Sequence, residues 1–354
     1  MSAFPLKPEP FRIEPIFSPR IWGARSLAPL FPEKTNLAEP LGEVWLTGLD
    51  CKIVTGPFAG RTLGAAWPEM SEEWRGSALK TVKEFPLLAK FIFPKEKLSI
   101  QVHPDDAYAA VHEKAAGGCG KTEMWHIVSA EPGAQLLAGL KPGVTKEKFL
   151  ESLASHTLEN LFQAPHVHAG DTFFIPAGMP HTIGPDMIVC EVQEYSDITY
   201  RIFDYDRVDA QGKPRELHIE KALEVIHFGF SRGGKVPPLA LGASHQHAKL
   251  LCACRYFAVE RLEFSERCEF ASDSEHSQLL IILAGRGNLG WPASAARYNA
   301  GECWFLPASV DLAALHPLQS TIVLRTYVPD IAALPKHLHD SGISASAIAQ
   351  SVFG

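Results

Sequence analysis

Two stretches of this 354-residue chain repeat one pattern. They read AGDTFFIPAGMPHTIG at 169–184 and AGECWFLPASVDLAAL at 300–315. Both start with Ala-Gly and an acidic residue, enter an aromatic and apolar run, and place Pro176 and Pro307 at matching positions. His181 of the first copy is replaced by Leu312 in the second. Such a repeat indicates two copies of one structural unit, so the sequence predicts two β-barrels, with a metal ligand kept only in the first.

The distribution of glycine and proline along the chain favours a mainly β fold with a few short helices. The 27 glycines and 27 prolines are spread along the sequence and predict many turns between short strands. Short helical segments are expected within 61–84, 141–162 and 216–228. The glycine-rich segment 104–121 is expected to be a mobile loop, and 235–242 a linker. The length suggests two domains, predicted at 1–235 and 236–354.

Charge and composition exclude several classes of partner. The net charge is −7, without a basic run, which argues against binding to nucleic acid. No apolar stretch is long enough to span a bilayer, and the N-terminus lacks the apolar core of a signal peptide. The seven cysteines are odd in number and lack zinc-type spacing. We therefore expect a protein that binds neither nucleic acid nor membrane and resides in the cytoplasm.

Two predicted strands carry candidate metal ligands. Strand side chains alternate between faces, so Gln101 and His103 share one polar face, and Lys121 and Glu123 share another. An imidazole, a carboxylate and an amide oxygen can bind zinc or a similar divalent ion. Taken alone, these faces are equally well explained as the solvated side of a sheet.

Other polar residues allow two interpretations each. Lys90 interrupts an apolar strand and either extends to solvent or points into a cavity. Trp22 is either core filler or, with Glu43, part of a cavity wall. Glu191 is either a catalytic base or, like Glu194, part of a solvated strand face.

The remaining histidines carry little functional signal. The HVH pair at 166 and 168 precedes a Gly-Asp turn and is interpreted as surface or loop. Four further histidines lie in the half without the metal-ligand pattern and are expected to be structural or exposed: His245, His247, His337 and His339.

Several motifs together resemble a known family. The pattern G-[DE]-x3-[IL]-P-x4-H at Gly170–His181 resembles the second motif of the cupin superfamily. The segments PLLAKFIFPKEKLSIQVHPDD, GKTEMWHIV, GDTFFIPAGMPHTIG and SDITYRIFD together resemble type I phosphomannose isomerase. The resemblance covers most of residues 15–230, with several motifs in matching order. It implies two cupin-like, jelly-roll β-barrels.

The resemblance also implies roles for particular residues. One zinc ion per chain would be held by Gln101, His103, Glu123 and His181. The catalytic arginine of the family falls on Arg201, and its two pocket lysines fall on Lys90 and Lys121. Ser99, Trp22 and Glu43 match residues that line the sugar-phosphate pocket.

The implied reaction interconverts mannose 6-phosphate and fructose 6-phosphate through an enediol. Arginine stays protonated, which suits Arg201 to electrostatic stabilisation more than to proton transfer. The base is left open among Glu191, Lys121, Asp197 and a metal-bound water. The chain also lacks the inserted helical domain of the eukaryotic members, and Gly120 stands where some members have histidine.

Two other functions compete with the isomerase. A regulatory bicupin that binds a sugar phosphate without turnover would not need the whole set of ligands and cations. An iron oxygenase of the cupin type usually has two or three histidines and a carboxylate, and the glutamine here disfavours it. A monomer and a homodimer are equally compatible with the sequence.

Overall fold

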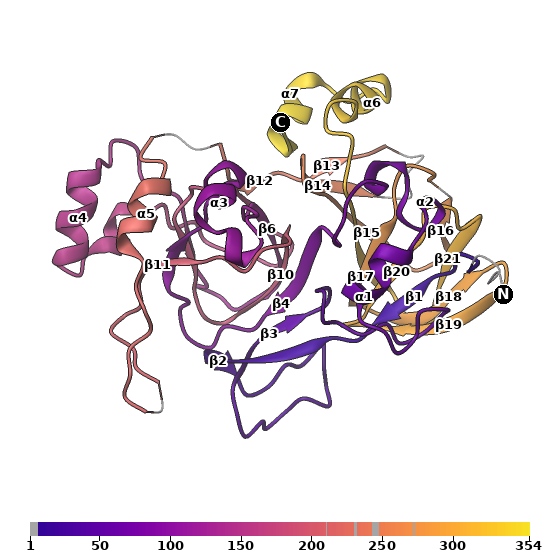
Figure 1. The fold of residues 1–354 in the computed structure, drawn as a ribbon, viewed down its shortest axis with the longest axis horizontal. Coiled ribbons are helices and arrows are strands. Elements are labelled where there is room, and N and C mark those ends of the chain that lie inside the picture. The colour runs from indigo at the N-terminus through magenta and orange to yellow at the C-terminus, as the bar shows by residue number, and fades with distance from the viewer. Residues whose placement is uncertain (1–5, 210, 230–231, 243–247, 272) are drawn as a thin grey trace.

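The structure is a computed structural model that describes residues 6–209, 211–229, 232–242, 248–271 and 273–354. It consists of two β-rich halves that lie side by side (Figure 1). Each half contains a large sheet and a four-stranded sheet. The mainly β class is therefore confirmed, although the described strands do not pair into closed barrels. None of the described helices is long and apolar enough to cross a membrane.

The first half contains the sheets that carry the predicted site. Its large sheet has the order β12 (Gly234–Val236), β8 (Thr172–Ile175), β6 (Glu123–Ala130), β10 (Met187–Glu194), β4 (Leu87–Ile92), β3 (Leu41–Trp45) and β2 (Ile16–Ala24). Its small sheet has the order β11 (Tyr200–Phe203), β5 (Ile100–Val102), β9 (His181–Ile183) and β7 (Leu136–Ala138).

The second half repeats this arrangement. Its large sheet has the order β1 (Phe11–Ile13), β20 (Cys303–Leu306), β17 (Gln278–Ala284), β22 (Thr321–Tyr327), β15 (Ala258–Phe264), β14 (Lys249–Cys254) and β13 (Leu239–Ala240), and β23 (Val352–Phe353) pairs with β14. Its small sheet has the order β16 (Cys268–Ala271), β21 (Leu312–Pro317), β18 (Arg286–Trp291) and β19 (Ser294–Asn299).

Short helices surround the sheets. They are α1 (Leu63–Ala66), α2 (Glu72–Arg75), α3 (Asp106–His112), α4 (Lys146–Ala154), α5 (Ile219–Val225), α6 (Leu334–Asp340) and α7 (Ala345–Ser351). Single 3-10 turns are η1 (Trp67–Glu69), η2 (Ser77–Leu79), η3 (Lys114–Ala116) and η4 (Leu158–Leu161). Helices α3, α4 and α5 lie beside the first half, and α6 and α7 beside the second (Figure 1).

Alternation along the strands divides the hydrophobic residues between two layers. In β6 and β10, Trp125, Ile127 and Val189 pack in a core shared with the small sheet. Their neighbours Met124 and Cys190 lie in a different core, which includes residues of the second large sheet. Burial of both faces explains why these strands are almost continuously apolar. Glu191 pairs with both Trp125 and Lys90, so the polar side chains of the site border the core that contains Trp125.

Three local predictions are wrong or only partly right. Segment 104–121 is not loop throughout, because Asp105 accepts a hydrogen bond from the backbone N–H of Tyr108 and caps α3. Segment 235–242 is not a bare linker, since it contains part of β12, which pairs with β8, and all of β13, which pairs with β14. The helix expected within 216–228 is shorter than predicted and occupies Ile219–Val225.

The predicted division at 235/236 stays a prediction. Strand β1, near the N-terminus, pairs with β20 of the second half, and Phe11 stacks on Phe305 with ring centroids 4.7 Å apart. The largest hydrophobic core also combines residues of both halves. The two halves are therefore in extensive contact.

Candidate metal centre and active site

Three buried side chains converge between the two sheets of the first half. His103 follows β5, Glu123 begins β6, and His181 begins β9. Oε1 of Glu123 lies 3.2 Å from Nε2 of His181 and 3.6 Å from Nε2 of His103. Each of the three side chains is at most 1% exposed. The sequence placed these residues on separate strands, and the fold brings their ligand atoms within 4.8 Å of one another.

The hydrogen bonds of the two histidines set their tautomers. Nδ1 of His103 lies 2.7 Å from the carbonyl of Ile198, and Nδ1 of His181 lies 2.8 Å from the carbonyl of Met179. A carbonyl only accepts hydrogen bonds, so each Nδ1 carries the proton and each Nε2 offers a lone pair. Burial, with the neighbouring Lys121, lowers the pKa of His103 to about 3 and keeps it neutral.

The carboxylate completes a donor set that fits a divalent cation. Oε1 of Glu123 is buried and has no hydrogen-bond partner within the described part of the chain. A buried polar atom without a partner is costly, and here it lies between two imidazole lone pairs. Two neutral histidines and one carboxylate are typical ligands of zinc. The residues present therefore fit the predicted metal.

Gln101 lies next to this cluster. It pairs with His181 across β5 and β9, and its amide nitrogen lies 3.3 Å from Nε2 of that histidine. The hydroxyl of Ser99 is 3.4 Å from the amide oxygen of Gln101. The two ends of an amide can be exchanged by rotation, which would turn the oxygen of Gln101 toward Nε2 of His181.

Lys121 connects the cluster to a cavity. Its ammonium group donates a hydrogen bond to Oε2 of Glu123 and lies 3.2 Å from Nε2 of His103. Burial raises the pKa of Glu123, but the positive charge of Lys121 outweighs it and holds that pKa well below its usual range. Lys121 also lines the cavity, so it contacts both the cluster of His103, Glu123 and His181 and the cavity.

A buried ion pair forms another part of the cavity wall. Lys90 of β4 and Glu191 of β10 are cross-strand partners with Nζ and Oε1 3.1 Å apart. The indole N–H of Trp125 donates to the other oxygen of Glu191 at 2.8 Å. Burial, together with nearby Glu123, raises the pKa of Glu191. Burial opposes the charge of Lys90, but Glu191 and Glu43 raise its pKa overall.

The cavity has a volume of about 310 Å³ and is mainly polar. Predicted site residues on its wall are Trp22, Glu43, Lys90, Ser99, Gln101, Lys121, Glu191 and Arg201. Asp197, one of the candidate bases, also lines it. The interpretation of Glu191 and Glu194 as a solvated strand face is wrong, since they are 3% and 2% exposed. Glu194 lies away from this wall and accepts a hydrogen bond from the backbone of Thr122.

Two arginines on the wall were missed by sequence reasoning. Arg20 makes a double hydrogen bond to Glu43 at 2.8 and 3.2 Å. Arg20 lies two residues before Trp22 in β2, on the same strand face, and this spacing could have identified it. Arg215 is held by Asp204 at 2.8 Å. No local pattern marks Arg215, because it reaches the cavity from an irregular segment.

Arg201 lies on β11 opposite Gln101. One of its terminal nitrogens donates to the carbonyl of Glu216 at 2.7 Å, while its buried Nε has no partner among the residues described. Burial lowers the pKa of Arg201, and the nearby Arg215 lowers it further. This end of the cavity therefore carries a concentration of positive charge.

The other histidines lie elsewhere. His168 is on the surface, with a side chain 76% exposed. His337 and His339 lie on α6, and His245 and His247 lie outside the described residues.

Comparisons with known proteins agree with this geometry. The family model for the catalytic domain of type I phosphomannose isomerase matches residues 11–124. The probable mannose-6-phosphate isomerase GmuF of Bacillus subtilis is 34% identical over 303 residues, which are 84% of this chain and 93% of that protein. The mannose-6-phosphate isomerase of Streptococcus mutans is 31% identical over 305 residues, which are 85% of this chain and 93% of that protein.

Solved structures show the same fold. The crystal structure of mannose 6-phosphate isomerase from Bacillus subtilis superposes with a TM-score of 0.80 at 28% identity, covering 89% of this chain and 99% of that one. A mannose 6-phosphate isomerase bound with zinc and yttrium matches with a TM-score of 0.70 at 15% identity, covering 90% and 99% of the two chains.

Fold and site define a mainly β protein with two related halves and a candidate metal centre in the first. The chain belongs to the type I phosphomannose isomerase family.

Proposed function

We propose that this protein is a zinc-dependent mannose-6-phosphate isomerase. The observation that carries the proposal is the position of Lys121, which contacts both Glu123 of the ligand cluster and the cation-lined cavity. Relatives named as this enzyme cover most of the chain. The zinc would be held by Gln101, His103, Glu123 and His181. When bound, it would supply a Lewis acid that stabilises the developing enediolate oxygen.

The residues of the chain supply substrate binding and proton handling. Arg201 and Arg215 lie at the positive end of the cavity, which suits a phosphate group. Trp22, Glu43, Lys90 and Ser99 would form the rest of the sugar pocket. Arg201 would orient and stabilise the anionic substrate, since a guanidinium keeps its proton.

Proton transfer between C2 and C1 of the sugar requires a group that both gives and accepts a proton. Lys121 and Glu191 are both buried, line the cavity and lie in one charged network. The raised pKa of Glu191 brings its protonated and ionised forms closer together in free energy. We assign it as the candidate base and Lys121 as a group that would stabilise negative charge developing on a sugar oxygen.

The proposal includes the predicted zinc stoichiometry, cellular compartment and oligomeric state. One zinc per chain follows from the single two-histidine cluster found in the described residues. All seven cysteines, which lie within the described ranges, are free, which supports a reducing compartment such as the cytoplasm. The choice between monomer and homodimer stays a prediction of the sequence.

The test measures conversion of mannose 6-phosphate to fructose 6-phosphate by purified protein before chelation, after chelation and after zinc is added back. We expect chelation to abolish activity and zinc to restore it, with about one zinc per chain by elemental analysis. His181→Ala should lose both metal and activity. Arg201→Ala should keep its metal and lose roughly 10²–10³-fold in kcat/KM, the usual cost of removing one electrostatic contact to a transition state.

The matched control is His168→Ala, which removes an exposed histidine and should change neither metal content nor rate. If the zinc-loaded protein binds mannose 6-phosphate and never converts it, the isomerase proposal fails, and the regulatory binder replaces it.

A further inference from the structure

The second half contains strands equivalent to those of the metal site. The order β8-β6-β10-β4 in the first large sheet corresponds to β20-β17-β22-β15 in the second. The Ile-Pro of the first repeat and the Leu-Pro of the second fix the alignment of β8 with β20. Ile175 pairs with Glu123, and Leu306 pairs with Gln278. Gln278 therefore occupies the position of the metal-ligand glutamate.

The small sheets give the other equivalent positions. His181 aligns with Leu312 in the repeat, and these residues pair with Gln101 and Ala271. His103 lies two residues after Gln101, and Asp273 lies two residues after Ala271, so His103 corresponds to Asp273. The four equivalent positions of the second half therefore hold Ala271, Asp273, Gln278 and Leu312. This set contains no imidazole and offers no zinc site.

The buried ion pair has an equivalent with its charges exchanged. In the first half, Glu191 pairs with Trp125 on one side and with Lys90 on the other. At the matching positions of the second half, Arg325 pairs with Leu280 and with Glu260. Nε of Arg325 lies 3.1 Å from Oε2 of Glu260, and Tyr327 donates to the other oxygen of that carboxylate at 3.0 Å. A charged pair therefore occupies equivalent positions in both halves, whereas the predicted metal ligands of the first half have no equivalents in the second.

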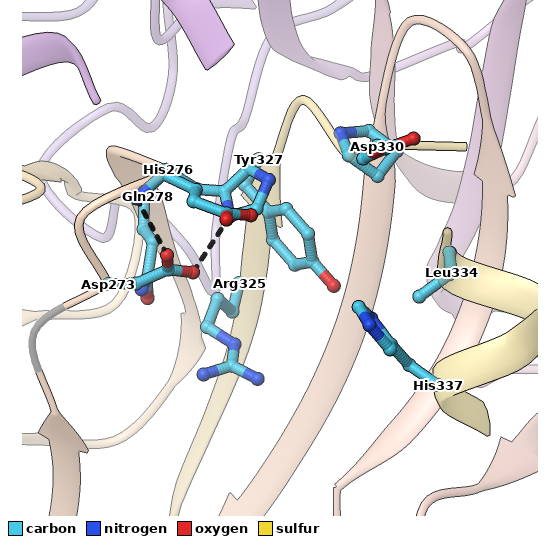
Figure 2. A pocket seen from close by; sticks show the side chains of 10 residues that line it. Asp273, His276, Gln278, Arg325, Tyr327, Asp330, Leu334 and His337 are labelled. Atoms are coloured by element: carbon cyan, nitrogen blue, oxygen red, sulfur yellow. Dashed lines mark hydrogen bonds and ion pairs between the residues drawn. The ribbon is translucent and has the colours of Figure 1, made fainter. Parts of the chain in front are cut away.

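A cavity of about 270 Å³ opens at this position. Figure 2 shows Asp273, His276, Gln278, Arg325 and Tyr327 around it, with Asp330 and His337 on the opposite side. The amide oxygen of Gln278 has no partner in the described ranges, although this residue is only 7% exposed. A buried polar atom facing a cavity indicates a position for a hydrogen-bonding ligand.

The polar atoms of this cavity require a ligand with both donors and acceptors. Nδ1 of His276 lies 2.8 Å from a carboxylate oxygen of Asp273, which only accepts, so Nδ1 carries a proton. In the neutral ring Nε2, buried and without a partner among the described residues, is then an acceptor. Arg325 adds a donor, because its guanidinium keeps all its protons. Gln278 adds both kinds of group. Hydroxyl groups both donate and accept, so they satisfy such a mixture, whereas an ammonium ion offers only donors and would leave the Arg325 donor without an acceptor.

Charge excludes an anionic ligand. Asp273, Glu275 and Asp330 line the cavity, and the one lining arginine is already paired with Glu260. The surroundings are therefore negative overall, unlike the arginine-lined cavity of the first half. A phosphate group would be repelled here, and an uncharged ligand would not.

We propose that the cavity of the second half binds an uncharged monosaccharide or a similar small polyol. The hydroxyl groups would bond to Gln278, His276 and Arg325, and the ring of Tyr327 would pack against the carbon face of the sugar. The site is separate from the candidate active site and does not depend on metal or on the proposed isomerase activity.

The test uses isothermal titration calorimetry of the zinc-loaded full chain with free mannose and with free fructose. Each titration is run without and with saturating mannose 6-phosphate, which occupies the first cavity. We expect saturable binding of at least one of the two sugars at one site per chain. Gln278→Ala should weaken it about tenfold or more, which corresponds to loss of one well-made hydrogen bond.

Gln319→Ala is the matched control, since it removes an exposed glutamine in the same half and should leave binding unchanged. His276→Ala provides a second test if Gln278→Ala does not fold. Activity should stay unchanged in all three variants. The proposal is overturned if no heat of binding is detected, if mannose 6-phosphate abolishes binding, if the variants bind like the wild type, or if inorganic phosphate or ethylammonium binds and the sugars do not.

Discussion

At the scale of single residues, the Lys90–Glu191 pair shows what the site costs in stability. The two side chains are 5% and 4% exposed. Taking two charges out of water is expensive, and a buried pair is often no more stable than apolar residues of the same volume. The pair faces the candidate substrate cavity, so we infer that its function there, rather than stability, explains its place.

Lys90→Met should destabilise the protein by about 3 kcal/mol, because it leaves the carboxyl group of Glu191 buried without its cation. The double variant Lys90→Met/Glu191→Gln should recover part of this loss, since an amide carries no charge. Urea unfolding of the wild type, both single variants and the double variant measures the coupling.

The surface pair Lys95–Asp186 supplies the control, with side chains 71% and 49% exposed. Lys95→Met should cost no more than about 1 kcal/mol. Equal effects at the two lysines would contradict the importance given to burial.

At the scale of elements, the short helix α3 follows β5 and the two predicted ligands Gln101 and His103. His103 follows β5, and Asp105 then caps α3 with a 2.8 Å hydrogen bond to the N–H of Tyr108. The turn is held further by the next residue, because Asp106 accepts a hydrogen bond from the N–H of Gly120 at 2.9 Å. The helix thus connects the segment after His103 with the segment that leads to Lys121.

Asp105→Ala should lower the free energy of unfolding by about 1 kcal/mol, because the first turn of α3 loses its cap. Asp105→Ser restores an acceptor and should recover most of this stability. Thermal unfolding at fixed zinc concentration measures both variants. A loss in the serine variant as large as that in the alanine variant would show that the cap is not the cause.

At the scale of the whole molecule, the halves are joined by apolar and polar contacts. Residues of both large sheets form one core. Beside it, Asp106 of the first half accepts hydrogen bonds from Tyr256 at 2.6 Å and from Arg255 at 2.7 Å in the second. Glu194 lies close to this junction and is 2% exposed. Burial, with the charge of Asp106 nearby, raises its pKa to about 8.

This shift makes stability depend on pH. A carboxyl group with a raised pKa binds more protons in the folded than in the unfolded chain, so stability falls as pH rises from about 4.5 to about 8, by up to roughly 1.4 kcal/mol per pH unit. Glu194→Gln keeps an acceptor for the N–H of Thr122 and cannot ionise. The variant should therefore lose less stability than the wild type between about pH 5 and pH 8.

Urea unfolding at several pH values gives the comparison. Glu131→Gln, at an exposed position, serves as control and should follow the wild type. Parallel curves for the wild type and Glu194→Gln would refute the assignment.

Much of the site was predictable because its residues occur in short motifs on strands. Gln101 and His103 are two residues apart, as are Lys121 and Glu123, and alternation alone placed each pair on one face. The wrong or missing parts have a different cause. The solvated-face interpretation of Glu191 and Glu194 failed because alternation does not say whether a face meets water or another sheet. Arg215 was missed because it enters the cavity from an irregular segment.

The sequence by itself determined the mainly β class, the repeat and the chemical types of the ligands, because these depend on local spacing and side-chain chemistry. Only the tertiary structure decided which atoms meet. Strand pairing brought Glu123 between His103 and His181. It also gave the second half a cavity lined by Arg325, which pairs with Glu260. These contacts join residues far apart in the chain, and their positions depend on how whole sheets pack, which no local pattern encodes.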